Sequence, residues 1–154
     1  MRVTLICVGR LAAAPEAALA ADYAARASAA GRQVGLSPVE IVEVESRKPG
    51  KAAEAEAILG RAAGAQLIAC DEHGQAMASR AFASWLARQR DDGVRALVFA
   101  VGGADGLGEA VLEAASARLA FGPQTWPHAL ARVMLAEQIY RAATILTGGP
   151  YHRD

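Results

Sequence analysis

The chain has 154 residues, of which 53% are hydrophobic and 21% charged, which is sufficient for one domain with an apolar core. Sixteen Lys and Arg balance sixteen Asp and Glu, so charge alone does not drive nucleic-acid binding, although RNA could still be recognised by shape or by a local arginine cluster. No apolar run reaches the roughly 18 residues of a membrane span, and a strand pattern begins at Arg2. We therefore expect a cytoplasmic protein without a membrane segment.

Short β-branched runs alternate along the chain with alanine-rich segments. The runs predict strands over 2–8, 39–44, 66–71, 96–101 and 117–121. The other segments predict helices over 15–30, from after Lys51 to about Gly64, and over 79–90, 109–115 and 127–147. Strands that alternate with helices predict an α/β fold in which a mostly parallel sheet is flanked by helices. No repeat or linker divides the chain, so we expect one domain over 1–154.

The two cysteines, Cys7 and Cys70, each lie inside an apolar run. Neither has a second Cys or a His at the spacing of a metal site. We expect two reduced thiols packed as small hydrophobes, with no disulfide and no metal.

Glycines and prolines follow three of the predicted strands, at 71–74, 102–106 and 121–128. Because ligands of open α/β sheets bind beyond the carboxyl ends of the strands, all three segments could face one pocket. The middle segment departs from the dinucleotide pattern G-x-G-x-x-G at Ala104 and Leu107, and it has no phosphate-binding Lys. Taken alone, its glycines are also compatible with a tight turn that binds nothing.

Together the three segments resemble a known family. Asp71-Glu72-His73-Gly74 is similar to its D-E-x-G segment, Val101–Leu107 to its I-G-G-x-[DE/N]-G-L turn, and Thr125–Val133 to its T-[FL]-P-H-x-x-x-R-V segment. Residues 137–142 and the ending Pro150-Tyr151-His152-Arg153 also match, so the resemblance extends over the whole chain. The family is the ribosomal RNA large subunit methyltransferase H family of SPOUT-class enzymes.

This resemblance implies a deep trefoil knot near the C-terminus, a homodimer, and methylation of N3 of a pseudouridine in 23S rRNA of the assembled ribosome. The implied methyl donor is S-adenosylmethionine. The positions that the family uses for it correspond to Cys70, Gly102, Phe121, Gly122, Pro123, Gln124, Thr125 and Trp126. Family members usually have leucine at position 70, and we expect the change to cysteine to preserve binding.

Methyl transfer requires alignment of donor and acceptor, together with removal of the proton from N3. We expect His152 or His128 to act in catalysis, with Arg132 and Arg153 as electrostatic partners. Alternatively, His128 only orients its loop. The resemblance implies RNA contacts for Tyr151, His152 and Arg153, which would otherwise be a frayed terminus.

The final helix is apolar almost all round, which predicts that it is buried or lies in an interface. Glu137 and Arg141, spaced i,i+4, predict a structural ion pair. We expect Asp71 and Asp105 to hold loops through backbone N–H groups; alternatively, they orient the amino group of the methyl donor. Trp126 could be a core residue, or it could stack near the adenine.

Two other functions remain compatible with the residues. One is a flavodoxin-like protein that binds a flavin or nucleotide at the same sheet edge, which the missing phosphate loop disfavours. The other is an RNA-binding or assembly factor that has lost catalysis.

Overall fold

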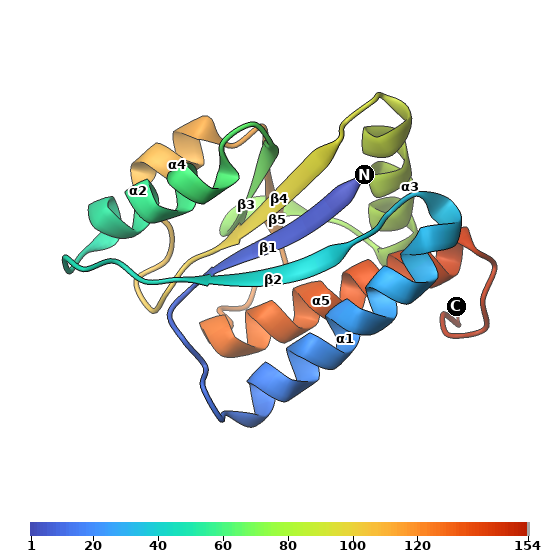
Figure 1. Cartoon of the computed structure of the whole chain (residues 1–154), viewed down its shortest axis with the longest axis horizontal. Coiled ribbons are helices and arrows are strands. Elements are labelled where there is room, and N and C mark those ends of the chain that lie inside the picture. Colours follow the sequence, from blue (N-terminus) through green and yellow to red (C-terminus); the bar gives the residue numbers. More distant parts are fainter. Residues whose placement is uncertain (154) are drawn as a thin grey trace.

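A computed structural model describes residues 1–153 and contains one five-stranded parallel sheet (Figure 1). The strands are β1 (Arg2–Val8), β2 (Val39–Val44), β3 (Gln66–Ala76), β4 (Ala96–Val101) and β5 (Ala117–Ala120), in the spatial order β2-β1-β4-β3-β5. Every neighbouring pair is parallel, so the carboxyl ends of all the strands lie at the same edge. This confirms the predicted α/β class.

Helices cover both faces of the sheet, as Figure 1 shows. One face carries α1 (Pro15–Gly31), α3 (Ser79–Asp91) and α5 (His128–Leu146), and α5 packs between α1 and α3. The opposite face carries α2 (Lys51–Ala62) and α4 (Glu109–Ala114). A short 3-10 helix, Arg32–Val34, which the sequence pattern did not predict, follows α1.

The two apolar cores follow from the alternation of side chains along the strands. In β4, Leu97 and Phe99 belong to the core beneath α1, α3 and α5, whereas Val98 and Ala100 belong to the core beneath α2 and α4. Successive residues of a strand point to opposite faces, so a strand covered on both sides must be apolar throughout. This explains why β4 is an uninterrupted apolar run.

The prediction that β3 ends at Asp71 is wrong. The strand continues to Ala76, and Leu119 of β5 pairs first with Cys70 and then with Gln75. Asp71–Gly74 therefore bulge out of the ladder between two stretches that pair with β5, a feature that the local polarity of the sequence does not distinguish from a turn. The segment 71–74 is called the β3 bulge below.

Several other boundaries differ by one or two residues from the predictions, and two of them border the β5–α5 segment. The last helix begins at His128, with Pro127 as the residue before its first turn, and β5 ends at Ala120. Among the described residues, no helix combines the length and the apolar character that crossing a membrane requires.

Candidate functional site

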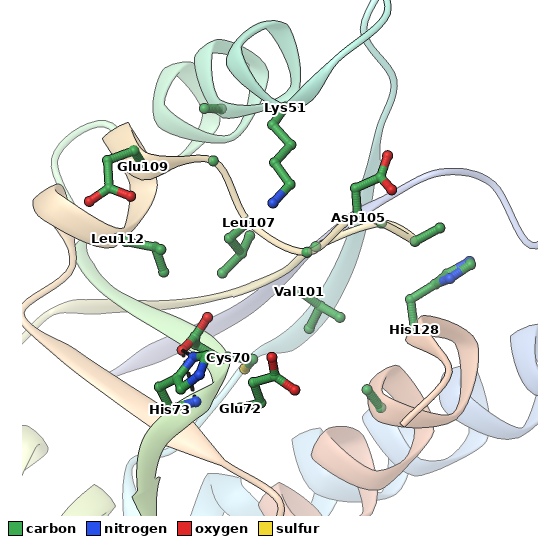
Figure 2. Close-up of a pocket in the computed structure, with 18 of the residues that line it drawn as sticks. Lys51, Cys70, Glu72, His73, Val101, Asp105, Leu107, Glu109, Leu112 and His128 are labelled. Carbon is green, nitrogen blue, oxygen red and sulfur yellow. Dashed lines mark hydrogen bonds and ion pairs between the residues drawn. The ribbon is translucent and has the colours of Figure 1, made fainter. Parts of the chain in front are cut away.

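A cavity of about 930 Å³ lies at the carboxyl edge of the sheet (Figure 2). Its walls come from α2, from the β3 bulge, from residues 101–112 after β4, and from the segment that joins β5 to α5. The three segments that the sequence analysis selected therefore line one cavity, because parallel strands deliver their ends to the same edge.

The segment after β4 is a tight turn that needs glycine for its own closure. A Cβ added to Gly102 would lie 2.5 Å from the carbonyl carbon of Gly106, which is too close for any substitution without movement of the backbone. Gly106 has a positive φ of 78°, and its N–H donates to the carbonyl oxygen of Gly103 at 3.0 Å. The glycines thus shape a compact wall made of main chain.

The β3 bulge is held by its own carboxylates. Asp71 accepts a hydrogen bond from the backbone N–H of His73 at 2.9 Å, and the same oxygen lies 3.3 Å from the imidazole Nδ1 of His73. Glu72 accepts a hydrogen bond of 3.4 Å from the hydroxyl of Thr125. This confirms that Asp71 holds a loop, and it shows that Glu72 ties the bulge to the segment after β5.

The β5–α5 segment closes the cavity on its remaining side. Of the predicted donor-binding positions, the following line the cavity: Cys70, Gly102, Phe121, Gly122, Gln124, Thr125 and Trp126. Pro123 does not. Trp126 is 38% exposed and donates its indole N–H to the carbonyl oxygen of Phe121 at 3.3 Å, so it is not a core residue.

His128 also lines the cavity. It is the first residue of α5, and Figure 2 shows its ring beside the cavity on the side of Asp105. Of the predicted catalytic residues, His128 is the one that the structure places at the cavity.

The charges of the cavity are mostly negative. Five carboxylate residues line it, namely Glu56, Asp71, Glu72, Asp105 and Glu109, together with one lysine, Lys51. The sequence analysis did not select Lys51, Glu56 or Glu109, because it looked for site residues in the segments that directly follow the strands and not in α2. The basic residues of the loop before α2 could have pointed to a positive charge near this edge of the sheet.

Burial raises the pKa of both thiols, which disfavours the reactive thiolate form. Cys70 lines the cavity, and burial raises the pKa of its thiol well above the ordinary value. Burial likewise raises the pKa of Cys7 to about 12. Both cysteines are free, and no group of three potential metal ligands occurs within residues 1–153.

Arg132 lies outside the cavity. Its side chain is only 2% exposed and does not line the cavity. The guanidinium pairs with Glu43 of β2 and donates to the carbonyl oxygen of Gly9 at 2.9 Å and of Val8 at 3.5 Å. The buried charge is thus committed to the carboxyl ends of β1 and β2, and the expected role of Arg132 as an electrostatic partner in catalysis stays a prediction.

Glu43 completes this contact, which we call the Arg132 clamp (Arg132, Glu43, Val8 and Gly9). Its carboxylate accepts a hydrogen bond from the Leu11 N–H at 3.1 Å. This backbone bond, helped by Arg132, lowers the pKa of Glu43 below its ordinary value. The clamp fastens the first turns of α5, and with them His128, to the sheet.

The C-terminal tail folds back on the far end of α5. The Tyr151 hydroxyl donates to Glu137 at 3.0 Å, and its ring lies 4.8 Å from the guanidinium of Arg141. Nδ1 of His152 lies 3.3 Å from Arg141. Arg141 also donates to Glu137 at 3.0 Å, which confirms the predicted structural pair. The tail is therefore ordered against the helix up to His152.

Known proteins resemble the whole chain. The family model described as predicted SPOUT methyltransferase matches residues 1–152. The ribosomal RNA large subunit methyltransferase H of Caulobacter sp. (strain K31) is 64% identical over 154 residues, covering 100% of both chains, and that of Phenylobacterium zucineum (strain HLK1) is 62% identical with the same coverage. This chain belongs to the SPOUT methyltransferases, in the ribosomal RNA large subunit methyltransferase H family.

Solved structures agree with this membership at the level of the fold. A probable methyltransferase from Bordetella pertussis Tohama I is 20% identical, with a TM-score of 0.54 and coverage of 92% of this chain and 96% of its own. As a member of the SPOUT methyltransferases, the protein is an enzyme that uses S-adenosylmethionine.

Replacement of Arg132 by Met should lower the free energy of unfolding by about 3 kcal/mol, because it removes one partner of a buried ion pair. Arg95→Met is the matched control, since Arg95 is exposed and its replacement should change stability by less than about 0.5 kcal/mol. Urea unfolding followed by circular dichroism measures both. Equal free energies of unfolding for the two variants would show that the Arg132 clamp does not stabilise the fold.

The contribution of Glu43 to the free energy of unfolding should depend on pH. Because the folded protein lowers its pKa, ionised Glu43 stabilises the fold fully above the ordinary value of 4.5, and this stabilisation is lost as the pH falls through the lowered pKa. The difference in unfolding free energy between the wild type and Glu43→Gln should therefore shrink on acidification from neutrality. A difference that is constant with pH would exclude a stabilising carboxylate.

Proposed function

We propose that this enzyme methylates N3 of a pseudouridine in the 23S rRNA of the assembled ribosome. The ribosomal target is supported by the names of relatives 62% and 64% identical over the full chain, and N3 of pseudouridine is what the resemblance implies. The observation that carries the proposal is the single cavity in which the motif segments 71–74, 101–107 and 121–128 meet.

The donor S-adenosylmethionine fits this cavity in size and chemistry. A volume of about 930 Å³ is within the range of small-molecule sites and leaves room for an acceptor base beside the donor. Main-chain groups from residues 102–106 and 121–126 can bind the adenosine part, with Cys70 as an apolar contact. The carboxylates complement the positive sulfonium. These residues are our proposed donor site, including Pro123, whose backbone would contribute.

The reaction moves a methyl group from the sulfonium to N3, while the N3 proton leaves to a base. We propose His128 as the acceptor of that proton, and the position of its ring at the cavity supports this choice. His152 remains the second candidate, with Tyr151 and Arg153 as RNA contacts. We propose that Arg132 acts indirectly, by positioning His128 one helical turn before it.

The tail can join this site if two copies of the chain combine. His128 precedes Arg141 by thirteen residues of α5, which spans about 20 Å, and His152 lies against Arg141. Within one chain, His152 is therefore remote from the cavity. We propose a homodimer in which the tail of one protomer lies near the cavity of the other.

Exposed apolar side chains support such a dimer. Leu130 at the start of α5 is 41% exposed and Leu19 on the adjacent α1 is 47% exposed, and Trp126 precedes α5. We propose that this face, formed by α1 and the start of α5, lies in the dimer interface.

We further propose that the chain is a single domain over residues 1–154, that it acts in the cytoplasm, and that it carries a deep trefoil knot near its C-terminus. The segment 121–127 leads from β5, at the edge of the sheet, to α5, which lies on the face opposite α2 and α4. That passage is where a knot would form.

A flavin or nucleotide is a poorer ligand for this cavity. Its five carboxylate residues would repel a phosphate group, and the turn after β4 has no lysine. The alternative of an RNA-binding factor without catalysis is separated from the proposal by activity alone.

Purified protein should transfer labelled methyl groups from S-adenosylmethionine to ribosomes, with N3-methylpseudouridine appearing in digested 23S rRNA. Gly102→Ala should weaken donor binding more than tenfold, because the added Cβ displaces the turn after β4. Cys70→Leu, which retains an apolar contact, should keep the affinity within about threefold. Calorimetric titration measures both affinities.

Binding of the donor without methyl transfer to any ribosomal particle would identify a factor that has lost catalysis. Methylation of a different RNA would overturn the proposed target, while the donor site would stand.

Mixing two inactive variants should restore activity if the site is shared between protomers. One variant carries Gly102→Ala, and the other lacks residues 151–154. Random pairing makes half of the dimers mixed, and each mixed dimer contains one complete site, so about a quarter of the wild-type activity should return. Persistent inactivity of a mixture shown to exchange subunits would contradict the shared site.

A further inference from the structure

Lys51 enters the cavity from the side opposite the β3 bulge. It is the first residue of α2, and Figure 2 shows its side chain extending from the helix toward the turn after β4, in the direction of Leu107. None of the residues considered for the donor or for catalysis lies on α2. Lys51 therefore brings to the cavity an ammonium group, which the segments after the strands do not supply.

The backbone position of Lys51 is fixed by close packing. A Cβ added to Gly108 would lie 2.7 Å from the carbonyl oxygen of Lys51 and 3.1 Å from the side chain of Ala55. The start of α2 thus rests directly on the residues that follow β4. This packing holds the lysine over the same turn that forms a wall of the proposed donor site.

The ammonium group of Lys51 has no partner within residues 1–153. No hydrogen bond or ion pair of its side chain occurs there, although five carboxylate residues line the same cavity. Among the described lining residues, Lys51 is also the single Lys or Arg. Lys51 is exposed, and a cation that lines a cavity without an internal partner is available to an anionic group of a ligand.

The charges of S-adenosylmethionine match this arrangement. The donor carries two positive groups, the sulfonium and the amino group, and one negative group, the carboxylate of its methionine part. The acidic residues suit the two cations, and one lysine suits the one anion. We propose that Lys51 binds the carboxylate of the donor. This inference rests on the proposed location of the donor in this cavity.

The proposal has a consequence for turnover. The product S-adenosylhomocysteine keeps the same carboxylate but has lost the sulfonium charge. Lys51 therefore binds donor and product alike, and this uniform contribution sets affinity without favouring the transition state. The distinction between donor and product is left to the carboxylates of the cavity.

The test compares S-adenosylmethionine with its decarboxylated analogue, which lacks the anionic group. Calorimetric titration should show that Lys51→Gln weakens S-adenosylmethionine about tenfold, as expected for loss of one charge-assisted hydrogen bond. The same variant should bind the decarboxylated analogue as tightly as the wild type does. Lys51→Arg should retain most of the affinity, because it keeps the charge.

Lys48→Gln is the matched control. Lys48 lies in the loop before α2 and does not line the cavity, so its replacement should leave both affinities unchanged. Thermal unfolding of each variant, followed by circular dichroism, establishes that the fold is intact.

Any of the following results would overturn the proposal. Equal loss of affinity of Lys51→Gln for S-adenosylmethionine and for the decarboxylated analogue would show that Lys51 does not bind the carboxylate. Unchanged donor affinity, with a raised KM for ribosomes, would assign Lys51 to an RNA phosphate instead. If the wild type binds no S-adenosylmethionine, the proposed donor site is wrong, and the role of Lys51 with it. If the wild type binds the donor and Lys51→Gln binds it equally well, only the inference about Lys51 is wrong.

Discussion

The Arg132 clamp is the contact on which the geometry of the site depends. A buried guanidinium is costly to leave unpaired, so the start of α5 must stay where Nη1 reaches Glu43 and Nη2 reaches the carbonyl oxygens of Val8 and Gly9. Within residues 1–153 its Nε is buried without a hydrogen-bond partner. This constraint fixes His128, one turn earlier, and with it the end of the β5–α5 segment. The wall formed by the β5–α5 segment is thereby fastened to the ends of β1 and β2, on the other half of the sheet.

The cavity itself depends on backbone more than on side chains. The turn after β4 closes because Gly102 leaves space for Gly106, and the β3 bulge is held by Asp71 and joined to Thr125 by Glu72. The main-chain walls offer uncharged contacts, and five carboxylate residues make the cavity acidic overall. A cavity of this kind suits a cationic donor and rejects phosphate, which accounts for the absence of a phosphate-binding loop from the sequence.

The sequence predicted the strands and helices well, because both faces of the sheet are covered and the buried strands are continuous apolar runs. It also predicted that three segments meet at one pocket, since that follows from parallel strands. The β3 bulge was missed because its residues are polar like those of a turn, and pairing with β5 is a long-range property. The burial of Arg132 was missed for a similar reason, since Glu43 lies 89 positions away in the chain.

Placement of the tail also needed the structure. The residues Tyr151 and His152 gave the resemblance its final motif, but their contact with Glu137 and Arg141 sets them at the end of α5 remote from His128. Local sequence carries no information about that distance. Lys51 shows the converse case, in which the basic first residue of α2 gains a specific meaning because α2 packs against Gly108.

The most direct measurement is a crystal structure of the protein with S-adenosylmethionine bound. Our account predicts electron density for one donor per cavity, bounded by Cys70, Gly102 and the segment 121–126, with the methionine carboxylate at Lys51. Density for the donor at another surface, or a donor whose carboxylate points away from α2 into solvent, would contradict it.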